Sequence, residues 1–254
     1  MNDDDIIRDL VNTISDKSEM QKSGIQNNGG RIDRNLPVQK NFKPVIYNSR
    51  TAGLVNDKII SYQLYNCFNY SLFINNNDNK NIKYMIGVTS ANPGEGKTTT
   101  ACNLATALSL SSQRKTVLVD LNIDNPRIHD IFGTQISPGI TDALHGKEIC
   151  VTPTKIENLS ILPAGNGKSI SPKKFINFNS IAYSLLQEFE FLIVDMASVT
   201  ARNFPTLIAN QLNGLIVVVE SNKTKRRDIN RIFRCVSEKN VIGFVMNKVN
   251  DEDF

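Results

Sequence analysis

Short apolar runs alternate with stretches of helical periodicity from residue 83 to residue 248. Six of the runs are rich in Val, Ile and Leu and lack polar alternation, which is typical of strands buried on both faces. The predicted strands are Tyr84–Val88, Thr116–Leu121, Leu159–Leu162, Phe191–Asp195, Leu215–Val219 and Val241–Val245. The predicted helices lie near Thr98–Leu110, Pro172–Glu188, Phe204–Leu212 and Lys225–Ser237. This order predicts an α/β fold with a doubly wound, mostly parallel sheet and helices on both faces.

The N-terminal quarter of the chain has a different pattern. Residues 1–56 are polar, contain Gly29-Gly30 and two prolines, and keep no apolar period, so we predict a flexible arm. It is either an untethered tail or a docking segment. Residues 57–75 carry apolar residues at spacings of three and four, which predicts a helix. We therefore divide the chain into an arm, 1–56, and one folded domain, 57–254.

Composition excludes several classes of protein. With 40% hydrophobic and 21% charged residues, the chain is neither disordered throughout nor fibrous. A formal charge of +4 is too small to favour nucleic acid as the main partner, and we expect none. No apolar run is long enough to span a bilayer, and the acidic first residues do not resemble a signal peptide. Four scattered cysteines without a CxxC pair argue against zinc and for a reducing cytosol, so we expect a cytoplasmic protein.

The strongest chemical motif is a phosphate-binding loop. Residues Ala91–Thr98 (ANPGEGKT) match the Walker A pattern except at Ala91, and they stand between a predicted strand and a predicted helix. Glycines allow the backbone to turn its N–H groups toward anionic oxygens, and the helix start adds a positive dipole end. We expect Lys97 to bridge the β- and γ-phosphates and Thr98 to bind Mg²⁺. The expected nucleotide-binding set in this loop is Pro93, Gly94, Glu95, Gly96, Lys97, Thr98 and Thr99.

Two apolar strands end in a carboxylate. Phe189–Asp195 (FEFLIVD) is a Walker B pattern, so Asp195 is expected to reach Mg²⁺ directly or through water. Val117–Asp120 (VLVD) ends in Asp120, which could polarise an attacking hydroxyl or hold a metal-bound water. Either acid could instead be an ordinary turn residue. The expected catalytic set is Lys97, Asp120 and Asp195, and the expected metal set is Thr98, Asp120 and Asp195.

Together these motifs resemble the kinase domain of the bacterial tyrosine autokinases (BY-kinases) of capsule and exopolysaccharide synthesis, which belong to the deviant-Walker P-loop ATPases. The resemblance spans roughly residues 60–248. Val117–Gly133 is similar to the family's Walker A′ motif, and Pro138–Gly146 and Leu159–Gly165 are similar to two further segments. The resemblance implies a P-loop NTPase fold, ATP and Mg²⁺ as cofactors, and contact of Asn247 with the adenine base.

The chain also departs from the family pattern. Asn122 stands where the family has a second carboxylate, and it is carried over as a nucleotide-binding position; an amide cannot act as a general base. Asp124 replaces an arginine, and Ala197-Ser198 replace two prolines. The last residues, 248–254, contain no tyrosine, so autophosphorylation at a C-terminal tyrosine cluster is not expected.

The resemblance implies a cytosolic protein-tyrosine kinase that regulates polysaccharide synthesis and export. It also implies a transmembrane chain-length or adaptor protein as partner, which could recruit the chain to the inner face of the membrane. A homo-oligomer is left open. One alternative is a catalytically weak ATP-dependent switch that docks such an adaptor. Another is a partition- or division-type positioning ATPase, against which the lack of an early lysine in the loop argues. The basic segment Lys223–Arg234 could face an acidic partner or a membrane, or be a solvated helix face.

Overall fold

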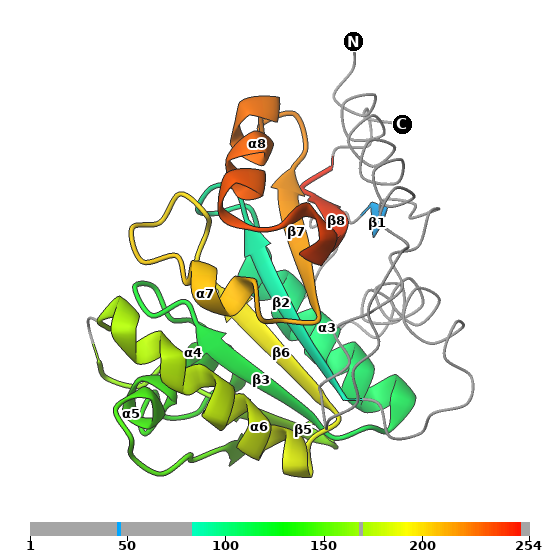
Figure 1. Ribbon diagram of the computed structural model, residues 1–254. Coiled ribbons are helices and arrows are strands. Elements are labelled where there is room, and N and C mark those ends of the chain that lie inside the picture. The colour runs from blue at the N-terminus through cyan, green and yellow to red at the C-terminus, as the bar shows by residue number, and fades with distance from the viewer. Residues whose placement is uncertain (1–44, 47–82, 168–169, 250–254) are drawn as a thin grey trace, which may run out of the picture.

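The computed structural model describes residues 45–46, 83–167 and 170–249, which form one sheet with helices on both of its faces (Figure 1). The strands are β1 Val45–Ile46, β2 Tyr84–Ser90, β3 Thr116–Leu121, β4 Thr152–Pro153, β5 Leu159–Leu162, β6 Phe191–Met196, β7 Gly214–Glu220 and β8 Val241–Asn247. The helices are α3 Lys97–Ser112, α4 Ile128–Phe132, α5 Ile140–Leu144, η3 Pro172–Asn177, α6 Phe178–Glu188, α7 Thr206–Ala209, α8 Arg226–Cys235 and η4 Glu238–Asn240, of which η3 and η4 are 3₁₀-helices.

The strand order places the phosphate-loop strand in the middle of the sheet. The order is β1-β8-β7-β2-β6-β3-β5-β4, and every neighbouring pair is parallel except β4 with β5. After β2 the chain moves first to one side of that strand (β3, β5, β6) and later to the other (β7, β8). Such a reversal opens a crevice at the carboxyl ends of the strands, where ligands bind in open α/β sheets. The predicted α/β fold with a mostly parallel sheet is confirmed.

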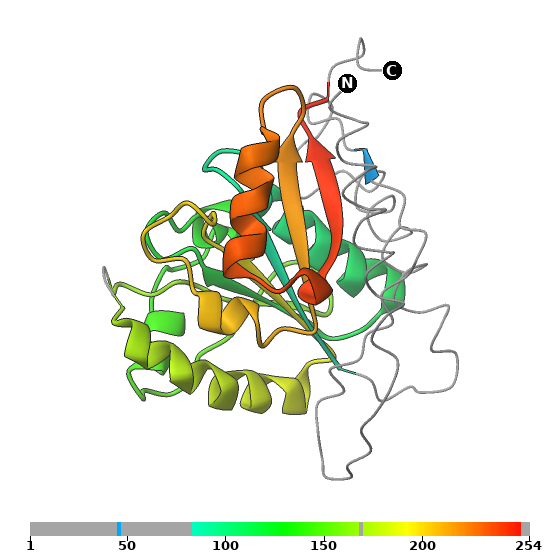
Figure 2. The ribbon, with the colours of Figure 1, turned by 45° about the horizontal axis from the view of Figure 1, so that its top comes forward.

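Each face of the sheet buries its own hydrophobic core. One core packs α3 and α4 against the side chains of Ile86, Val88, Leu118 and Ile193. The other packs α5, α6, α7 and α8 against the side chains that alternate with these in the same strands. Figures 1 and 2 show α6, α7 and α8 on one face and α3 on the opposite face. This double coverage explains why the strands read as continuous apolar runs.

Some predicted elements need correction. All six predicted strands are present, with ends that differ by at most two residues. The helix predicted for Phe204–Leu212 is wrong in extent: only Thr206–Ala209 is helical, because Pro205 precedes it and the chain turns into β7 soon afterwards. The first turns of the Pro172–Glu188 prediction are a 3₁₀-helix. The short helices α4 and α5 and the two-residue strand β4 were not predicted.

Several predictions fall on other parts of the chain. Val45–Ile46 lie within the predicted arm and pair with the edge strand β8. The rest of the arm, the predicted helix 57–75 and the last five residues lie outside the described residues. Within the described residues, no helix is both long and apolar enough to cross a membrane.

Candidate nucleotide-binding site

The phosphate loop joins the central strand β2 to the N-terminus of α3. Gly94 and Gly96 have φ angles of +84° and +97°, a conformation that favours glycine. Gly96 is also the N-cap of the 16-residue helix α3, which has no side-chain cap and no acidic residue in its first turn. The first backbone N–H groups of α3 therefore remain available, and the dipole end has no acidic neighbour within the helix. This arrangement is suited to an anion such as a phosphate.

Glu95 braces the loop from inside. Its side chain is buried, with 2% exposure. One carboxylate oxygen accepts hydrogen bonds from the Asn92 backbone N–H at 2.9 Å, and the other accepts from the Asn92 side chain at 3.2 Å. The Thr224 hydroxyl, from the loop between β7 and α8, donates to that second oxygen at 2.5 Å. Glu95 thus acts as the hub of the loop, and its carboxylate is occupied by contacts within the protein.

Residues at the end of β8 also contact the phosphate loop. Asn247 donates from its side-chain amide to the Glu95 carbonyl at 2.9 Å, while its own amide oxygen is buried without a partner within the described part of the chain. A Cβ added to Gly96 would come within 1.9 Å of this amide nitrogen, so the glycine is required for the close approach. The Lys248 ammonium donates to the Gly94 carbonyl at 2.8 Å and pairs with Glu220 at 3.0 Å. Thr224 and Lys248 were not predicted as site residues, since neither belongs to a nucleotide-binding motif.

Thr98 and Asp195 meet beneath the loop. The Thr98 hydroxyl donates to one carboxylate oxygen of Asp195 at 2.7 Å. The other oxygen of Asp195 is buried and has no hydrogen-bond partner among the described residues. Lys97 is also buried, with 9% exposure, and its positive charge acts on Asp195. A hydroxyl and a carboxylate with one uncommitted oxygen are a suitable donor set for Mg²⁺.

Asp120 has a different set of partners. It is fully buried, and its carboxylate accepts hydrogen bonds from the backbone N–H groups of Asn122 at 3.2 Å and of Arg127 and Ile128 at 3.1 Å each. These bonds hold the N-terminal end of α4 and the turn after β3. Asp120 is therefore a structural anchor in addition to a candidate for catalysis.

The two acids lie side by side on neighbouring strands. Asp120 and Asp195 are direct Cα partners in the ladder between β3 and β6, and adjacent strands are about 4.8 Å apart. Burial and the nearby charge of Asp120 raise the pKa of Asp195 to about 8, against the opposing effects of Lys97 and the Thr98 hydrogen bond. Burial also raises the pKa of Asp120 to about 6, although its three backbone hydrogen bonds oppose that shift. A cation between loop and acids would remove this electrostatic cost.

The remaining predicted site residues lie around the loop. Asn122 is buried and donates from its side-chain amide to the Asn125 carbonyl at 3.0 Å, so it stabilises the turn after β3. Pro93 is exposed at the tip of the loop, and Thr99 is half-buried in the first turn of α3. All predicted residues of the site thus lie on the phosphate loop or at the carboxyl ends of β3, β6 and β8.

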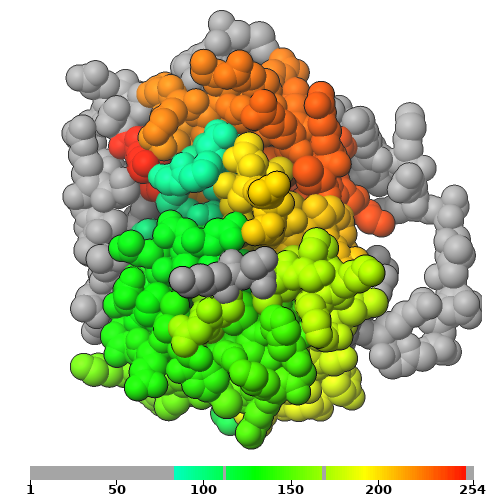
Figure 3. Space-filling model, turned by 90° about the vertical axis from the view of Figure 1, so that its left-hand side faces the viewer, coloured from blue at the N-terminus to red at the C-terminus, as the bar shows by residue number. Residues whose placement is uncertain are grey.

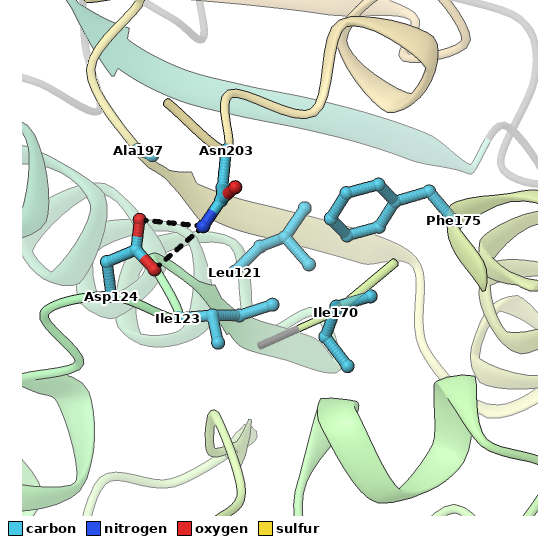
Figure 4. A pocket seen from close by; sticks show the side chains of 7 residues that line it. All are labelled: Leu121, Ile123, Asp124, Ile170, Phe175, Ala197 and Asn203. Carbon is cyan, nitrogen blue, oxygen red and sulfur yellow. Dashed lines mark hydrogen bonds between the residues drawn. The ribbon is translucent and has the colours of Figure 1, made fainter. Parts of the chain in front are cut away.

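A hollow lies near the carboxyl ends of β3 and β6, and neither Asp120 nor Asp195 lines it. It is formed where the segments after β3 and β6 diverge, and Figure 4 shows the side chains that line it. They are Leu121, Ile123, Asp124, Ile170, Phe175, Ala197 and Asn203. The Asn203 amide donates to both carboxylate oxygens of Asp124, at 3.1 and 3.3 Å, and so links the two segments across the rim. No sequence motif predicts this link.

Two segments flank the phosphate loop at the surface. Figure 3 shows the loop, in teal, between the β7–α8 segment, in orange, and the segment after β6, in yellow. The contact with the first is the Thr224–Glu95 hydrogen bond. The contact with the second includes a bond from the Thr200 hydroxyl to the Ala91 carbonyl at 3.0 Å. The loop is therefore held by elements on both sides of the central strand.

Known proteins are similar to this chain in sequence. The model of the CobQ/CobB/MinD/ParA nucleotide-binding domain matches residues 86–253. Tyrosine-protein kinase CpsD of Streptococcus pneumoniae is 30% identical over 179 residues, which cover 65% of this chain and 76% of that protein. The succinoglycan biosynthesis transport protein ExoP of Rhizobium meliloti is 27% identical over 176 residues, which cover 65% of this chain but 22% of that protein.

A solved structure supports the same relationship. The crystal structure of the VpsO kinase domain has a TM-score of 0.65 and 25% sequence identity, and the match covers 76% of this chain and 96% of that one. Residues 86–253, which the family model matches, contain the phosphate loop and both acids. The chain therefore belongs to the CobQ/CobB/MinD/ParA nucleotide-binding domain family, within its group of bacterial tyrosine-protein kinases.

Proposed function

We propose that this chain is an ATP-dependent protein-tyrosine kinase that acts in the synthesis and export of a capsular polysaccharide or exopolysaccharide. The observation that carries the proposal is the arrangement beneath the phosphate loop. There, the Thr98 hydroxyl and the uncommitted oxygen of Asp195 lie at the uncapped N-terminus of α3. The names of CpsD and ExoP support the kinase activity and the link to polysaccharide.

Mg-ATP fits the residues of the site. The backbone N–H groups of residues 94–99 would bind the phosphates, and Lys97 would bridge the β- and γ-phosphates. Thr98 and Asp195 would hold Mg²⁺, which when bound neutralises charge on the phosphoryl oxygens. Asn247, whose buried amide oxygen has no hydrogen-bond partner among the described residues, would contact the base.

The protein's own contribution to phosphoryl transfer would be mainly positioning. In this chemistry most of the acceleration comes from alignment and charge stabilisation. The Lys97 ammonium supplies a buried positive charge, and Asp195 orients the Thr98 hydroxyl. The Asp120 carboxylate already accepts three backbone hydrogen bonds. It would orient the attacking tyrosine hydroxyl through its remaining lone pairs.

A second candidate is an ATP-dependent switch with weak or no kinase activity. The hydrogen bonding of Asp120 favours it, because an acid that anchors α4 has less freedom to accept a proton. Asn122 favours it as well, since its amide cannot be a base and its N–H₂ group is already bonded to Asn125. In this case the bound nucleotide would change the affinity for a partner, and no phosphotyrosine would form.

For both candidates we propose a transmembrane chain-length or adaptor protein as partner. The transport function in the name of ExoP supports this choice, because that protein includes a region similar to this chain within a much longer sequence. A homo-oligomer is compatible with the same site. Recruitment through the partner would place the chain at the inner face of the membrane.

The deciding experiment is a search for phosphotyrosine. Full-length protein is incubated with Mg-ATP and a Glu/Tyr copolymer, and both are analysed by mass spectrometry. The proposal predicts phosphotyrosine on the copolymer or on the chain, and none with the Lys97→Met variant. Measurable ATP binding without phosphotyrosine on either would reject the kinase and leave the switch.

A further inference from the structure

The net positive charge of this chain is concentrated on one helix and its flanks. Residues 223–239 contain seven Lys or Arg and two Asp or Glu, whereas the formal charge of the whole chain is +4. The rest of the chain is therefore slightly acidic. Helix α8 lies within this segment, on the surface of the domain over β7 and β8 (Figure 2).

The outward face of α8 is almost entirely arginine. The helix has five exposed residues, and they are Arg226, Arg227, Asn230, Arg231 and Arg234. At 100° per residue these five positions fall within one side of the helix. The other side carries the apolar residues that α8 contributes to the core.

Few acids neutralise this face. Arg227 and Arg231 approach the carboxylate of Asp228 at 3.8 and 3.5 Å, which are long contacts from exposed side chains. No ion pair is recorded for Arg226 or Arg234 within the described part of the chain. Two of the four guanidinium groups are thus without an acidic neighbour there, and each can bind a carboxylate through two parallel hydrogen bonds.

The chemistry of this face fits an acidic polypeptide better than a lipid bilayer. A helix that binds a membrane buries apolar side chains in it, whereas the five exposed residues of α8 are all polar. Its Ile229 and Ile232 are buried in the core, and Phe233 packs partly buried against the same core. The face is about 15 Å long, the length of roughly four or five extended residues. The guanidinium groups along this face of the helix would bind several carboxylates of one such acidic segment.

The same face is connected to the phosphate loop. The loop that leads into α8 contains Thr224, whose hydroxyl accepts from the Glu220 backbone N–H at 2.8 Å and donates to buried Glu95 at 2.5 Å. Glu95 is the hub of the phosphate loop. A shift of the phosphate loop on nucleotide binding would therefore act directly on the start of α8.

We propose that the arginine face of α8 docks an acidic segment of a partner protein, and that the Thr224–Glu95 contact couples this docking to the phosphate loop. Docking itself stands on α8 alone, whereas the coupling rests on the proposed function. Because coupling is reciprocal, bound nucleotide would change the affinity for the acidic segment, and the segment would change the affinity for nucleotide by the same factor.

Docking is tested with a fluorescein-labelled decaglutamate peptide and the full-length protein, by fluorescence anisotropy. Binding should occur in the absence of nucleotide and weaken with added salt, because exposed ion pairs are screened. Arg226→Glu/Arg234→Glu should weaken binding about tenfold or more, as the loss of two charged contacts predicts. The matched control is Lys155→Glu/Lys173→Glu, which changes the net charge equally at exposed sites away from α8, and it should leave the affinity within about twofold.

An equal loss in the control, or no binding by the wild type, would overturn the proposal. So would binding of the protein to vesicles of phosphatidylserine and phosphatidylcholine with none to the peptide, since that outcome favours a membrane. Thermal unfolding of each variant establishes that it is folded.

Coupling is tested by repeating the peptide titration with saturating Mg-ATP. The peptide affinity should change in the wild type and in Thr224→Ser, which keeps the hydroxyl, and should not change in Thr224→Val. An unchanged affinity in the wild type, with ATP binding verified separately by calorimetry, would overturn the coupling. Absence of ATP binding would instead reject the proposed function and leave the docking result intact.

Discussion

The ends of β3 and β6 carry the same residue type at the same level of the sheet, yet their carboxylates have different partners. Asp120 accepts three backbone hydrogen bonds and anchors the start of α4. Asp195 accepts one hydrogen bond, from Thr98, and keeps one buried oxygen without a partner in the described structure. An apolar strand that ends in Asp can thus produce either a structural anchor or a site prepared for a cation. The hydrogen bonds around each acid distinguish the two.

The largest effect is expected when the charge of Asp195 is removed, and it should appear in the affinity for Mg-ATP. In Asp195→Asn, the amide oxygen can still accept from Thr98, but the ligand charge is lost. We expect Mg-dependent ATP affinity to fall about tenfold or more, since a charged ligand contact contributes at least about 1.4 kcal/mol. Calorimetric titration with and without Mg²⁺ measures this, and an equal affinity in variant and wild type would contradict the assignment of Asp195.

The corresponding change at Asp120 should act mainly on stability. In Asp120→Asn, one end of the side chain becomes a donor that faces backbone N–H donors. We expect the free energy of unfolding to fall by about 1–3 kcal/mol. Denaturant unfolding of the nucleotide-free protein compares the two variants: Asp195→Asn should be as stable as the wild type or more so. The contrast between the two acids would be lost if both variants were destabilised equally.

The pH dependence of stability tests the raised pKa of Asp195. The pKa of Asp195 is raised from 3.8 to about 8, so the folded state retains a proton that the unfolded state releases across this interval. The contribution of Asp195 to stability must therefore decrease as the pH rises through that window. The free energy of unfolding of nucleotide-free wild type, relative to Asp195→Asn, should fall between pH 5 and pH 8. A difference that stays constant or rises with pH would contradict the raised pKa.

A smaller effect is expected at Asn122, next to Asp120. If its amide limits phosphoryl transfer, Asn122→Asp should raise the rate of phosphotyrosine formation by supplying a second carboxylate. Single-turnover assays at saturating Mg-ATP measure this. A rate equal to or below that of the wild type would show that the Asn122 amide does not limit phosphoryl transfer.

Much of the fold could be predicted from the local pattern of apolar and polar residues, whereas the site could be predicted only in part. The strands β2, β3 and β6 could be predicted because burial on both faces requires continuous apolar runs. The helices α4 and α5 have five residues each, too few to show a period. The phosphate loop and both acids could be predicted because their chemistry requires particular residues at fixed spacing.

The side chains that contact the phosphate loop from other elements could not be predicted, because these contacts join distant parts of the chain. Thr224 bonds to Glu95 across 129 positions, and Lys248 bonds to Gly94 across 154. The sequence identifies Asn247 by resemblance, yet only the structure shows that it packs against Gly96. The role of Asp120 as an anchor likewise requires knowledge of where α4 begins.

The most direct test of the account is calorimetric titration of Mg-ATP into the wild type and Lys97→Met. Lys97 is buried under the phosphate loop, so its removal should abolish productive binding while the unfolding transition stays cooperative. We expect saturable, Mg-dependent binding by the wild type and none by the variant. Equal ATP affinity in the two proteins would contradict the claim that residues 94–99 and the Asp195 carboxylate form the nucleotide site.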